Sequence, residues 1–300
     1  MSDIVVGFDC GASHTRASIW KNDKLLVSHD EIAGLNFDVI GKEEAVDLVM
    51  PVVTELSRYQ GAVWVVGMAG LDNEHEEKEA VEWWKRVLAS AGVKFSVLKV
   101  VSDIELVLWA GSEDGVGIGL IAGTGSNCVG RNLKGKEIKV GGMSHIMSDE
   151  GSGFSLGWRC LHIITKMNDG RVASNGLLKE VLGVYKKKNI VELKNYLVES
   201  EHMKSEVARA AIPLLSAAQK GERLAEEAVL VEVFELVQMV AAVNMRLSPI
   251  HHLDLYLAGS LFKNKYYLNI FERKLKATFY DQKVSLVKPL DGVINMAKKL

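Results

Sequence analysis

Apolar residues in the first hundred positions form short runs of strand length that alternate with amphipathic stretches of helix length. Three apolar runs follow one another with turn residues between them, and from there helices and strands alternate. The predicted strands cover residues 4–9, 15–20, 24–32, 62–70 and 94–103, and the predicted helices cover residues 42–59 and 75–92. A three-strand meander followed by helix–strand alternation is typical of a mixed sheet with helices on its faces.

The same order partly restarts near residue 115. Three further short strands are predicted, a mostly helical stretch follows, and the chain closes with strand, helix, strand and helix. The strands are expected at residues 116–123, 126–132, 137–142, 253–260 and 283–289, the helical stretch at 150–247 and the last helix at 291–300. The pattern predicts an α/β protein of two related halves, each opening with a meander whose first turn is rich in glycine and hydroxyl residues.

The composition is that of an ordinary globular chain, with 300 residues, 48% hydrophobic, 25% charged and a net charge of −2. Acidic and basic residues are interspersed, so neither nucleic acid nor an anionic membrane is expected as a partner. No signal peptide is expected before the first strand, and the most apolar helix, residues 224–247, is too polar to span a bilayer. Three widely spaced cysteines fit neither a metal site nor a disulfide framework, which predicts reduced thiols and a cytoplasmic location.

Two turns carry the candidate chemistry. GFDCGASHT at residues 7–15 and IAGTGSN at residues 121–127 each place glycine and hydroxyl residues after a predicted strand. Glycines let backbone N–H groups form an anion-binding concavity, and hydroxyl groups add donors for phosphate oxygens. Asp9 is suited to hold Mg²⁺ through water. Either turn alone fits a tight hairpin equally well, but the pair of them favours a clamp around a nucleotide polyphosphate.

These motifs resemble those of the sugar kinase, Hsp70 and actin ATPase superfamily, and within it the group of N-acetylglucosamine kinases and BadF/BadG-type ATPases. The two turns resemble the first and second phosphate motifs. GGMSHIMSDEGSGFSLG at residues 141–157 is similar to the group's signature, G-G-W-G-H-x-x-G-D-E-G-S. AAQKGERLA at 217–225 resembles a turn between two helices of the C-terminal half, and LAGSLF at 257–262 resembles the adenosine-side motif. The resemblance covers the whole chain.

The resemblance implies a fold of two ribonuclease-H-like domains, the actin-like ATPase arrangement, with an interdomain cleft. The N-terminal lobe would cover residues 1–110 together with the last helix, residues 290–300. The C-terminal lobe would cover residues 111–289 and include a helical insertion. ATP and Mg²⁺ would lie in the cleft, and a sugar would lie between lobes that close to exclude water.

The resemblance also implies roles for individual residues. The expected nucleotide-binding residues are Gly11, Ser13, His14, Thr15, Gly123, Thr124, Gly125, Gly259 and Ser260. Asp9 would hold Mg²⁺. The residues expected to contact sugar hydroxyls are Asn36, Asn127 and Asp149. Asp103 stands where a predicted strand ends and a helix begins, a position where aspartate commonly caps the helix; the resemblance implies the catalytic base of a sugar kinase instead, and both roles can coexist.

Several positions depart from the group's motifs. Ser13 replaces the usual Thr and His14 the usual Lys in the first phosphate motif. In the signature, Met143 replaces Trp, and Ser144 and Ser148 each replace a Gly. These positions lie where the group contacts the sugar, so they leave the identity of the sugar open.

The expected reaction is ATP-dependent phosphorylation of a hexose or amino sugar at its 6-hydroxyl, with N-acetylglucosamine as the first choice of substrate. Glucosamine, glucose and N-acetylmuramic acid are the nearest alternatives. A BadF-type ATPase activator would need exposed thiolates for an iron–sulfur cluster shared by a dimer, whereas Cys10, Cys128 and Cys160 fall in the turns and a helix. A sensor that binds without catalysis is a third hypothesis, which the presence of Asp9 and Asp103 disfavours. Dimers are common in the group, so a homodimer is compatible with the resemblance.

Overall fold

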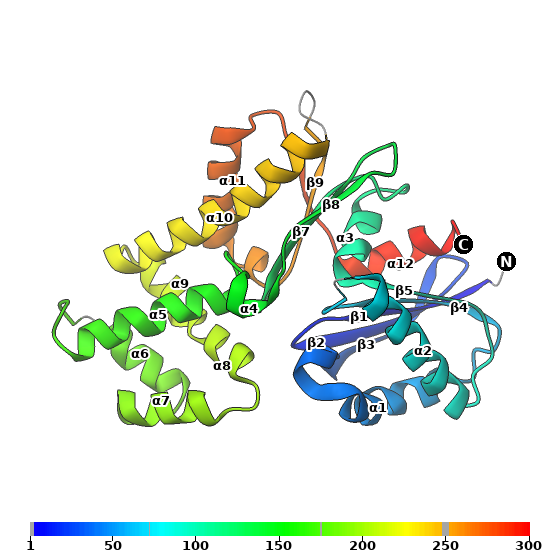
Figure 1. Ribbon diagram of the computed structural model, residues 1–300, viewed down its shortest axis with the longest axis horizontal. Coiled ribbons are helices and arrows are strands. Elements are labelled where there is room, and N and C mark those ends of the chain that lie inside the picture. The colour runs from blue at the N-terminus through cyan, green and yellow to red at the C-terminus, as the bar shows by residue number, and fades with distance from the viewer. Residues whose placement is uncertain (1–2, 72, 175, 248–251) are drawn as a thin grey trace.

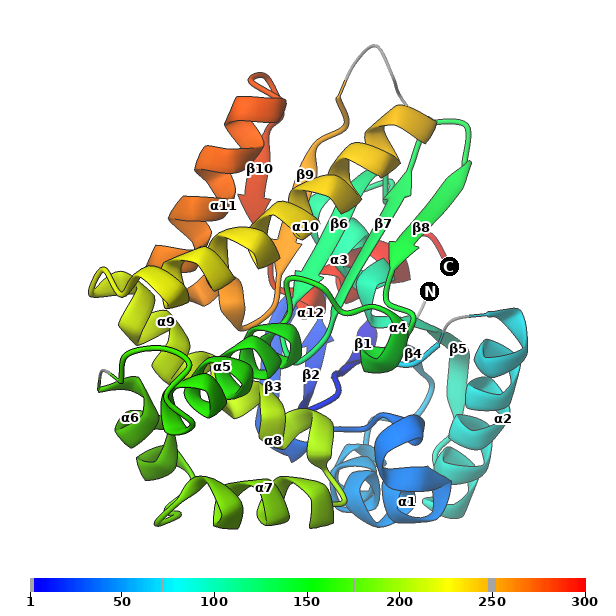
Figure 2. The ribbon, with the colours of Figure 1, turned by 60° about the vertical axis from the view of Figure 1, so that its left-hand side comes forward.

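The computed structural model describes residues 3–71, 73–174, 176–247 and 252–300. Two five-stranded sheets, one from each half of the chain, lie beside one another with helices on their faces (Figure 1). Figure 2 shows the ribbon turned by 60°, so that the strands of the second sheet, from β10 to β8, can be seen side by side. We call the two the N-terminal sheet and the C-terminal sheet.

The N-terminal sheet has the strand order β3-β2-β1-β4-β5. Its strands are β1 (Ile4–Cys10), β2 (His14–Lys21), β3 (Lys24–Ala33), β4 (Ala62–Met68) and β5 (Phe95–Ser102). The meander β1–β3 is antiparallel, and β4 and β5 run parallel to β1. Every strand begins and ends within two residues of its predicted bounds, because apolar runs bounded by turn residues are a clear strand signal.

The C-terminal sheet repeats this topology with the order β10-β9-β6-β7-β8. Its strands are β6 (Gly117–Ala122), β7 (Ser126–Arg131), β8 (Glu137–Gly141), β9 (Leu255–Ala258) and β10 (Val284–Leu286). β6 pairs antiparallel with β7 and parallel with β9, as β1 does with β2 and β4. The prediction of two related halves is therefore confirmed.

Helices cover both faces of the N-terminal sheet. α1 (Phe37–Leu56) and α2 (Glu74–Ser90) pack on one face, where the ring of Phe8 lies 5.9 Å from that of Trp64 and 5.0 Å from that of Trp84. α3 (Asp103–Gly111) and α12 (Pro289–Ala297) pack on the other face. Asn73 caps α2 by accepting hydrogen bonds from the N–H groups of residues 75 and 76.

α1 begins at Phe37, whereas the sequence predicts its start at residue 42. Gly41 has φ +73° and ψ 164°, so it interrupts the helix after its first turn. Glycine accepts this left-handed conformation without the steric cost that a Cβ brings. Only the part after the glycine carries a regular helical pattern, which is why the prediction began there.

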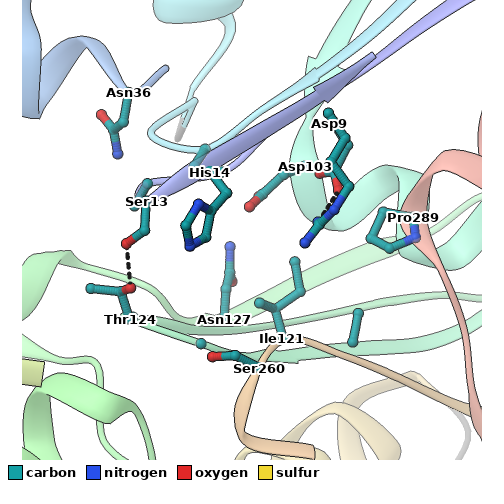
Figure 3. Close-up of a pocket in the computed structure, with 18 of the residues that line it drawn as sticks. Asp9, Ser13, His14, Asn36, Asp103, Ile121, Thr124, Asn127, Ser260 and Pro289 are labelled. Carbon is teal, nitrogen blue, oxygen red and sulfur yellow. Dashed lines mark hydrogen bonds and ion pairs between the residues drawn. The ribbon is translucent and has the colours of Figure 1, made fainter. Parts of the chain in front are cut away.

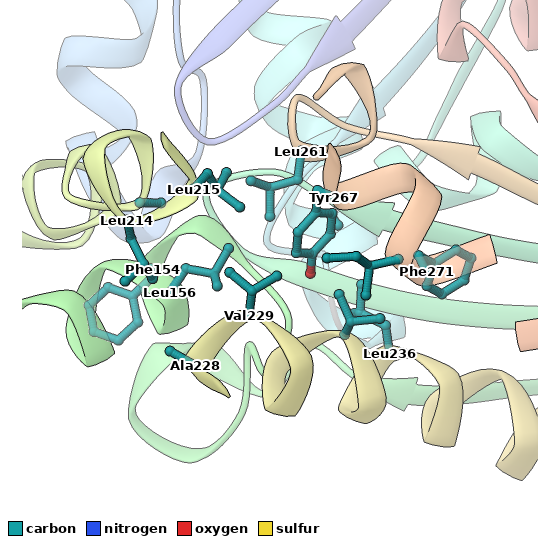
Figure 4. Close-up of a cluster of buried hydrophobic side chains, with 14 of the residues drawn as sticks. Phe154, Leu156, Leu214, Leu215, Ala228, Val229, Leu236, Leu261, Tyr267 and Phe271 are labelled. Atoms are coloured by element: carbon teal, nitrogen blue, oxygen red, sulfur yellow. The ribbon is translucent and has the colours of Figure 1, made fainter. Parts of the chain in front are cut away.

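The second half is mainly helical. Its helices are α4 (Ser144–Met147), α5 (Gly153–Asn168), α6 (Leu177–Val184), α7 (Ile190–Glu199), α8 (Met203–Arg209), α9 (Ala211–Gln219), α10 (Arg223–Leu247), the short η1 (Leu261–Lys263) and α11 (Lys265–Thr278). One continuous hydrophobic core joins all of these helices except α4 to the C-terminal sheet. Figure 4 shows Leu156, Val229, Leu236 and Tyr267 converging within it. α4 lies before the predicted helical stretch and was not predicted, because four residues are too few to show helical periodicity.

α10 is long and apolar enough to cross a membrane by length and composition alone. Many of its apolar side chains, however, are buried inside the protein: Val233, Leu236 and Val240 are fully inaccessible. α10 packs against the sheet and against α5, α9 and α11. It is therefore the central core helix of the C-terminal half, as its polar residues predicted.

α12 returns from the C-terminal sheet to the N-terminal sheet (Figure 1). Val293 and Met296 are buried there with Trp20 and Val65. The approach is close: a Cβ on Gly292 would lie 2.2 Å from the backbone oxygen of Leu106 in α3. β10 is shorter than predicted because Pro289, which cannot donate to a strand ladder, starts this helix.

Candidate active site

A cavity of about 1480 Å³ lies between the two sheets. Its walls come from both halves of the chain, and side chains from the two β-turns face one another across it (Figure 3). We call the turn between β1 and β2, residues 11–13, the first loop, and the turn between β6 and β7, residues 123–125, the second loop. The two loops occupy equivalent positions in the duplicated topology.

The two loops touch. Ser13 Oγ lies 2.7 Å from Thr124 Oγ1, a hydrogen bond between residues 111 positions apart (Figure 3). Within the loops, Gly11 N–H donates to the His14 carbonyl at 2.9 Å, and Gly123 N–H donates to the Gly125 carbonyl at 2.9 Å. Glycine, serine and threonine from both halves are thus brought to one place, as the phosphate-clamp hypothesis requires.

The segment after β3 supports the first loop and carries Asn36. Leu35 N–H donates to the Gly11 carbonyl at 3.1 Å. Gly34 must be small there, because a Cβ would lie 2.2 Å from the carbonyl oxygen of Ala12. Asn36 follows directly, is 8% exposed and lines the cavity. The backbone of the first loop therefore fixes the position of the Asn36 amide.

Asp9 ends β1 beneath the first loop. It stands opposite Arg16 in the β1–β2 register, and Arg16 Nη1 lies 3.4 Å from Asp9 Oδ2. Burial raises the pKa of Asp9 to about 6, against the lowering effect of the Arg16 guanidinium. Both side chains line the cavity, so a positive charge and a carboxylate face it side by side.

Asp103 is the first residue of α3, and Ser102 occupies the N-cap position. The capping role considered for Asp103 therefore belongs by position to Ser102, whose side chain makes no capping hydrogen bond. α3 comes close to β4 because Gly67 has no side chain: a Cβ would lie 2.4 Å from Leu106 Cδ1. This packing brings the Asp103 carboxylate to the cavity beside Asp9 (Figure 3).

Asp149 lies in the turn after α4, with a left-handed backbone of φ +70°. Its Oδ1 accepts a hydrogen bond from Ser126 N–H at 3.0 Å, and its Oδ2 lies 2.7 Å from Lys204 Nζ on α8. Gly125 has to be small, because a Cβ would lie 2.8 Å from Asp149 Oδ1. The second loop thus holds the carboxylate in place.

A buried network behind this turn holds its backbone. Glu232 of α10 accepts from Gly151 N–H at 2.6 Å and pairs through its other oxygen with Arg159. Tyr267 of α11 donates to the Gly151 carbonyl at 2.7 Å. Glu232 is 1% exposed and Tyr267 fully buried, so two core helices fix the left-handed turn that carries Asp149.

Asn127 follows the second loop in β7 and lines the cavity. Gly142, with φ +72°, leaves room for it: a Cβ there would lie 2.9 Å from Asn127 Cγ. Within the part of the chain that the structure describes, no donor reaches the buried Asn127 Oδ1. An acceptor left without a donor in a polar cavity is suited to a ligand hydroxyl.

Gly259 and Ser260 directly follow β9 (Leu255–Ala258) on the same cavity wall. Gly259 has φ +108°, and a Cβ would lie 2.2 Å from the carbonyl oxygen of Ala122. The glycine is therefore required for packing against the strand that leads into the second loop. Lys263 and Lys288 line this wall as well and add positive charge.

The structure brings nearly all of the predicted site residues to the cavity. The residues that line it are Asp9, Gly11, Ser13, His14, Asn36, Asp103, Gly123, Thr124, Gly125, Asn127, Asp149, Gly259 and Ser260. Thr15 is the exception: its side chain is fully buried beside Cys10, its β1 partner, and does not form part of the wall.

Several charged residues of the cavity were not predicted, and two of them pair with predicted site residues. Arg16 pairs with Asp9, and the hairpin register could have revealed it, because pairing Cys10 with Thr15 across a four-residue turn sets residue 16 opposite residue 9. Lys204 pairs with Asp149 from the helical insertion. Nothing in the sequence around Lys204 marks it, because only the tertiary fold brings α8 to the second loop.

A model of the BadF/BadG/BcrA/BcrD ATPase family matches residues 6–294. The chain belongs to this family. An N-acetylmuramic acid/N-acetylglucosamine kinase from Clostridium acetobutylicum is 31% identical over 271 residues, 88% of this chain and 87% of the relative. An N-acetyl-D-glucosamine kinase from Dictyostelium discoideum is 25% identical over 195 residues, 60% of this chain and 59% of the relative.

Solved structures of other proteins share the fold of this chain. A candidate N-acetylglucosamine kinase from Chromobacterium violaceum superimposes with a TM-score of 0.76 at 19% identity, covering 98% of each chain. A hexokinase from Schistosoma mansoni complexed with glucose gives a TM-score of 0.59 at 13% identity, covering 100% of this chain and 86% of the other. The two-domain, actin-like fold implied by the motifs is confirmed.

Proposed function

We propose that this family member is an ATP-dependent sugar kinase that phosphorylates a hexose or amino sugar at its 6-hydroxyl, with N-acetylglucosamine as the first candidate. The observation that carries the proposal is the contact between Ser13 and Thr124, which joins the two glycine-rich loops in one cavity with Asp103. Relatives across most of the chain are named kinases of N-acetylated amino sugars. Glucosamine, glucose and N-acetylmuramic acid remain the alternative substrates.

The two loops are the proposed phosphate-binding elements. Their backbone N–H groups and hydroxyls donate to phosphate oxygens, as in other glycine-rich anion sites. We assign residues 1–110 with 290–300 to one lobe and residues 111–289 to the other, so that ATP lies in the cleft between them. Ser260 is proposed for the adenosine side, and Lys263 and Lys288 add neutralising charge to that wall.

Mg²⁺ fits the cavity as a substrate-bound ion. Asp9 offers a buried carboxylate on its wall, and no group of three or more His, Cys, Asp or Glu ligands is found among the described residues. Mg²⁺ commonly binds through one or two carboxylates, substrate phosphates and water, without a full protein cage. When bound, it neutralises charge on the transferring phosphoryl group.

Asp103 is the proposed base. Its carboxylate faces the cavity from the start of α3, where the helix dipole favours the ionised form. It would accept the proton of the 6-hydroxyl as that oxygen attacks phosphorus in line with the leaving ADP. Asn36, Asn127 and Asp149 are proposed to hold the remaining hydroxyls, because amide and carboxylate groups match their donors and acceptors.

An ATPase activator of the BadF type is the second candidate, favoured by the family name alone. All three thiols, Cys10, Cys128 and Cys160, are buried, and burial raises the pKa of each. Iron–sulfur clusters are held by thiolates, so these residues do not suit one at a subunit surface. We further propose a cytoplasmic enzyme whose partner is a small sugar, not nucleic acid or membrane, and which can form a homodimer.

An assay of ADP release with a panel of sugars tests the proposal. The panel comprises N-acetylglucosamine, glucosamine, glucose and N-acetylmuramic acid, with a sugar-free reaction as the control. We expect sugar-dependent ADP release and a sugar 6-phosphate detectable by mass spectrometry. ADP release that is equal with and without every sugar would overturn the kinase assignment, and iron in the purified protein would favour the activator.

A further inference from the structure

Lys204 reaches the cavity from the helical insertion. Its ammonium lies 2.7 Å from Asp149 Oδ2, the carboxylate proposed to bind sugar hydroxyls. The Lys204 side chain is only 22% exposed and that of Asp149 is 4% exposed. An ion pair so withdrawn from water needs further hydrogen bonds to offset the cost of desolvation.

The Lys204 ammonium has N–H donors that are not used by Asp149. Lysine carries three N–H donors, and Asp149 is its one hydrogen-bonding or ionic partner within the ranges that the structure describes. Asp149 also keeps acceptor capacity, since Ser126 N–H and Lys204 each use one of its oxygens. The pair therefore presents both a donor and an acceptor to the cavity that both residues line.

Contacts other than the Lys204 ion pair hold α8 in place. Tyr185 Oη donates to the Glu206 carbonyl at 2.6 Å, and the neighbouring Val207 is buried in the core. α5 packs directly on the same turn, since a Cβ on Gly157 would lie 2.0 Å from the Val207 carbonyl oxygen. These contacts position α8 without using the Lys204 side chain.

The pair lies directly against the second loop. A Cβ on Gly125 would lie 2.8 Å from Asp149 Oδ1 and 3.1 Å from Lys204 Nζ. Burial lowers the pKa of the nearby His145 imidazole, and the Lys204 charge lowers it further. A ligand bound to the pair would therefore adjoin the loop proposed to hold the phosphates.

We propose that Lys204 is a sugar-binding residue, and that Asp149 and Lys204 bind two neighbouring oxygens of the sugar, one as acceptor and the other as donor. The inference rests on the proposed kinase function and adds a contact from the helical insertion. A vicinal pair of hydroxyls offers one donor and one acceptor at adjacent carbons, which this pair of side chains matches. The two side chains together carry no net charge, which suits a neutral polyol better than an anionic group.

The test compares Lys204→Met, which removes the charge at similar length, with Lys204→Gln, which keeps a donor for Asp149 and protects folding. Lys194→Met, an exposed lysine on α7 of the same insertion, is the matched control. Steady-state kinetics with N-acetylglucosamine and ATP separate the two Michaelis constants, and calorimetry measures sugar binding without ATP. Because a hydrogen bond to a charged group is lost, we expect the sugar KM to rise roughly 10- to 100-fold in Lys204→Met.

In the expected result, the ATP KM and the control stay at wild-type values, and Lys204→Gln shifts the sugar KM in the same direction by less. A sugar analogue deoxygenated at C3 or C4, at whichever carbon Lys204 contacts, should bind the wild type weakly and lose nothing further in Lys204→Met. An unchanged sugar KM in a folded variant, or a rise in the ATP KM alone, would overturn the inference.

A loss confined to N-acetylmuramic acid would also overturn it, because Lys204 would then serve the carboxylate of that sugar. If the wild type itself phosphorylates no sugar in the panel, the proposed function fails first. The two failures are therefore distinguishable.

Discussion

At the scale of single residues, Asp9 shows how burial and charge oppose one another in the cavity. Burial raises its pKa to about 6 from an ordinary value of 3.8, although Arg16 lies 3.4 Å away and lowers it. At a pH between these two values the folded protein holds a proton that the unfolded chain has released. Folding stability contributed by Asp9 is therefore complete below about pH 4 and declines as the pH rises through 6.

Asp9→Asn should remove this part of the pH dependence. In metal-free, nucleotide-free buffer, the wild type should lose up to about 3 kcal/mol between pH 4 and pH 8 relative to the variant. Urea denaturation of both proteins at several pH values measures the difference. Arg16→Met, which removes the charge that lowers the pKa of Asp9, should make the total loss larger and extend it to higher pH. Parallel stability curves for wild type and Asp9→Asn would contradict the expectation.

Asp103→Asn should abolish turnover and spare the fold. Its side chain stands at the first helical position and is not the cap of α3, so an amide of the same size can take its place. Loss of a general base typically lowers the rate by about 100- to 10,000-fold. ADP-release kinetics give kcat, and calorimetry shows whether sugar and ATP still bind. Near-normal kcat in the variant would rule out Asp103 as the base.

Many of the site residues that the sequence revealed belong to two short motifs. Ser13, Thr124 and their neighbouring glycines belong to turns that carry their own pattern. Lys204 was missed because its significance lies in a contact with Asp149 that only tertiary packing creates. Thr15 was expected at the nucleotide because it belongs to the same motif, but strand alternation turns its side chain into the core.

At the scale of elements, glycines decide how closely helices and strands approach. Gly157 lets α5 lie against the backbone of α8, where a Cβ would be 2.0 Å from the Val207 carbonyl oxygen. Gly67 does the same for α3 against β4. Backbone cannot retreat as a flexible side chain can, so alanine at Gly157 must displace α8.

Gly157→Ala should therefore destabilise the protein by about 1–3 kcal/mol, the usual cost of overpacking. The matched control is Gly183→Ala in α6, where a Cβ would meet nothing within 4 Å. Because alanine favours helix more than glycine does, the control should be neutral or gain up to about 1 kcal/mol. Chemical denaturation compares the two, and equal stability of both variants would exclude the steric account.

Elements with a strong local pattern were predicted well, and those shaped by their neighbours were not. The strands of the two sheets have apolar runs bounded by turn residues, and their positions followed from the sequence except for the end of β10. The first turn of α1 was missed because Gly41 separates it from the rest. α4 was missed because its four residues are held by the turn around them and show no periodicity of their own.

At the scale of the whole molecule, the cavity is defined by two loops that come from different halves. Their contact at Ser13 and Thr124 leaves no room for a phosphate between the two hydroxyls. If both loops bind one triphosphate, the halves must separate enough to admit it. Motion of one half against the other then becomes part of substrate binding.

A double variant, Ser13→Cys with Thr124→Cys, should test this requirement. The replaced oxygens are 2.7 Å apart, which lies close to a disulfide bond of about 2.05 Å. The native thiols are buried and should not compete. We expect the oxidised protein to lose ADP release and the reduced form of the same protein to regain it. Equal activity in both forms, with the disulfide verified by mass spectrometry, would contradict the need for separation.

The arrangement of the halves could not be deduced from the sequence pattern alone. The apolar pattern predicted two similar meanders. The cleft between the two halves was expected only from the resemblance of the motifs to a known family. The same holds for α12. It returns to the N-terminal sheet because Val293 and Met296 pack against Trp20 and Val65 on one face of that sheet. These contacts join residues more than 200 positions apart, so the local sequence pattern cannot predict them.

The return of α12 also bears on how the protein is made. Domains generally begin to fold in order as the chain leaves the ribosome. Here α3 covers part of one face of the N-terminal sheet, but the part near Trp20 lacks its cover until residues 289–297 have been synthesised. That apolar surface therefore stays exposed while the other half is translated. α12 thus covers a sheet that is translated long before it, and chaperone binding to that surface is expected until α12 packs there.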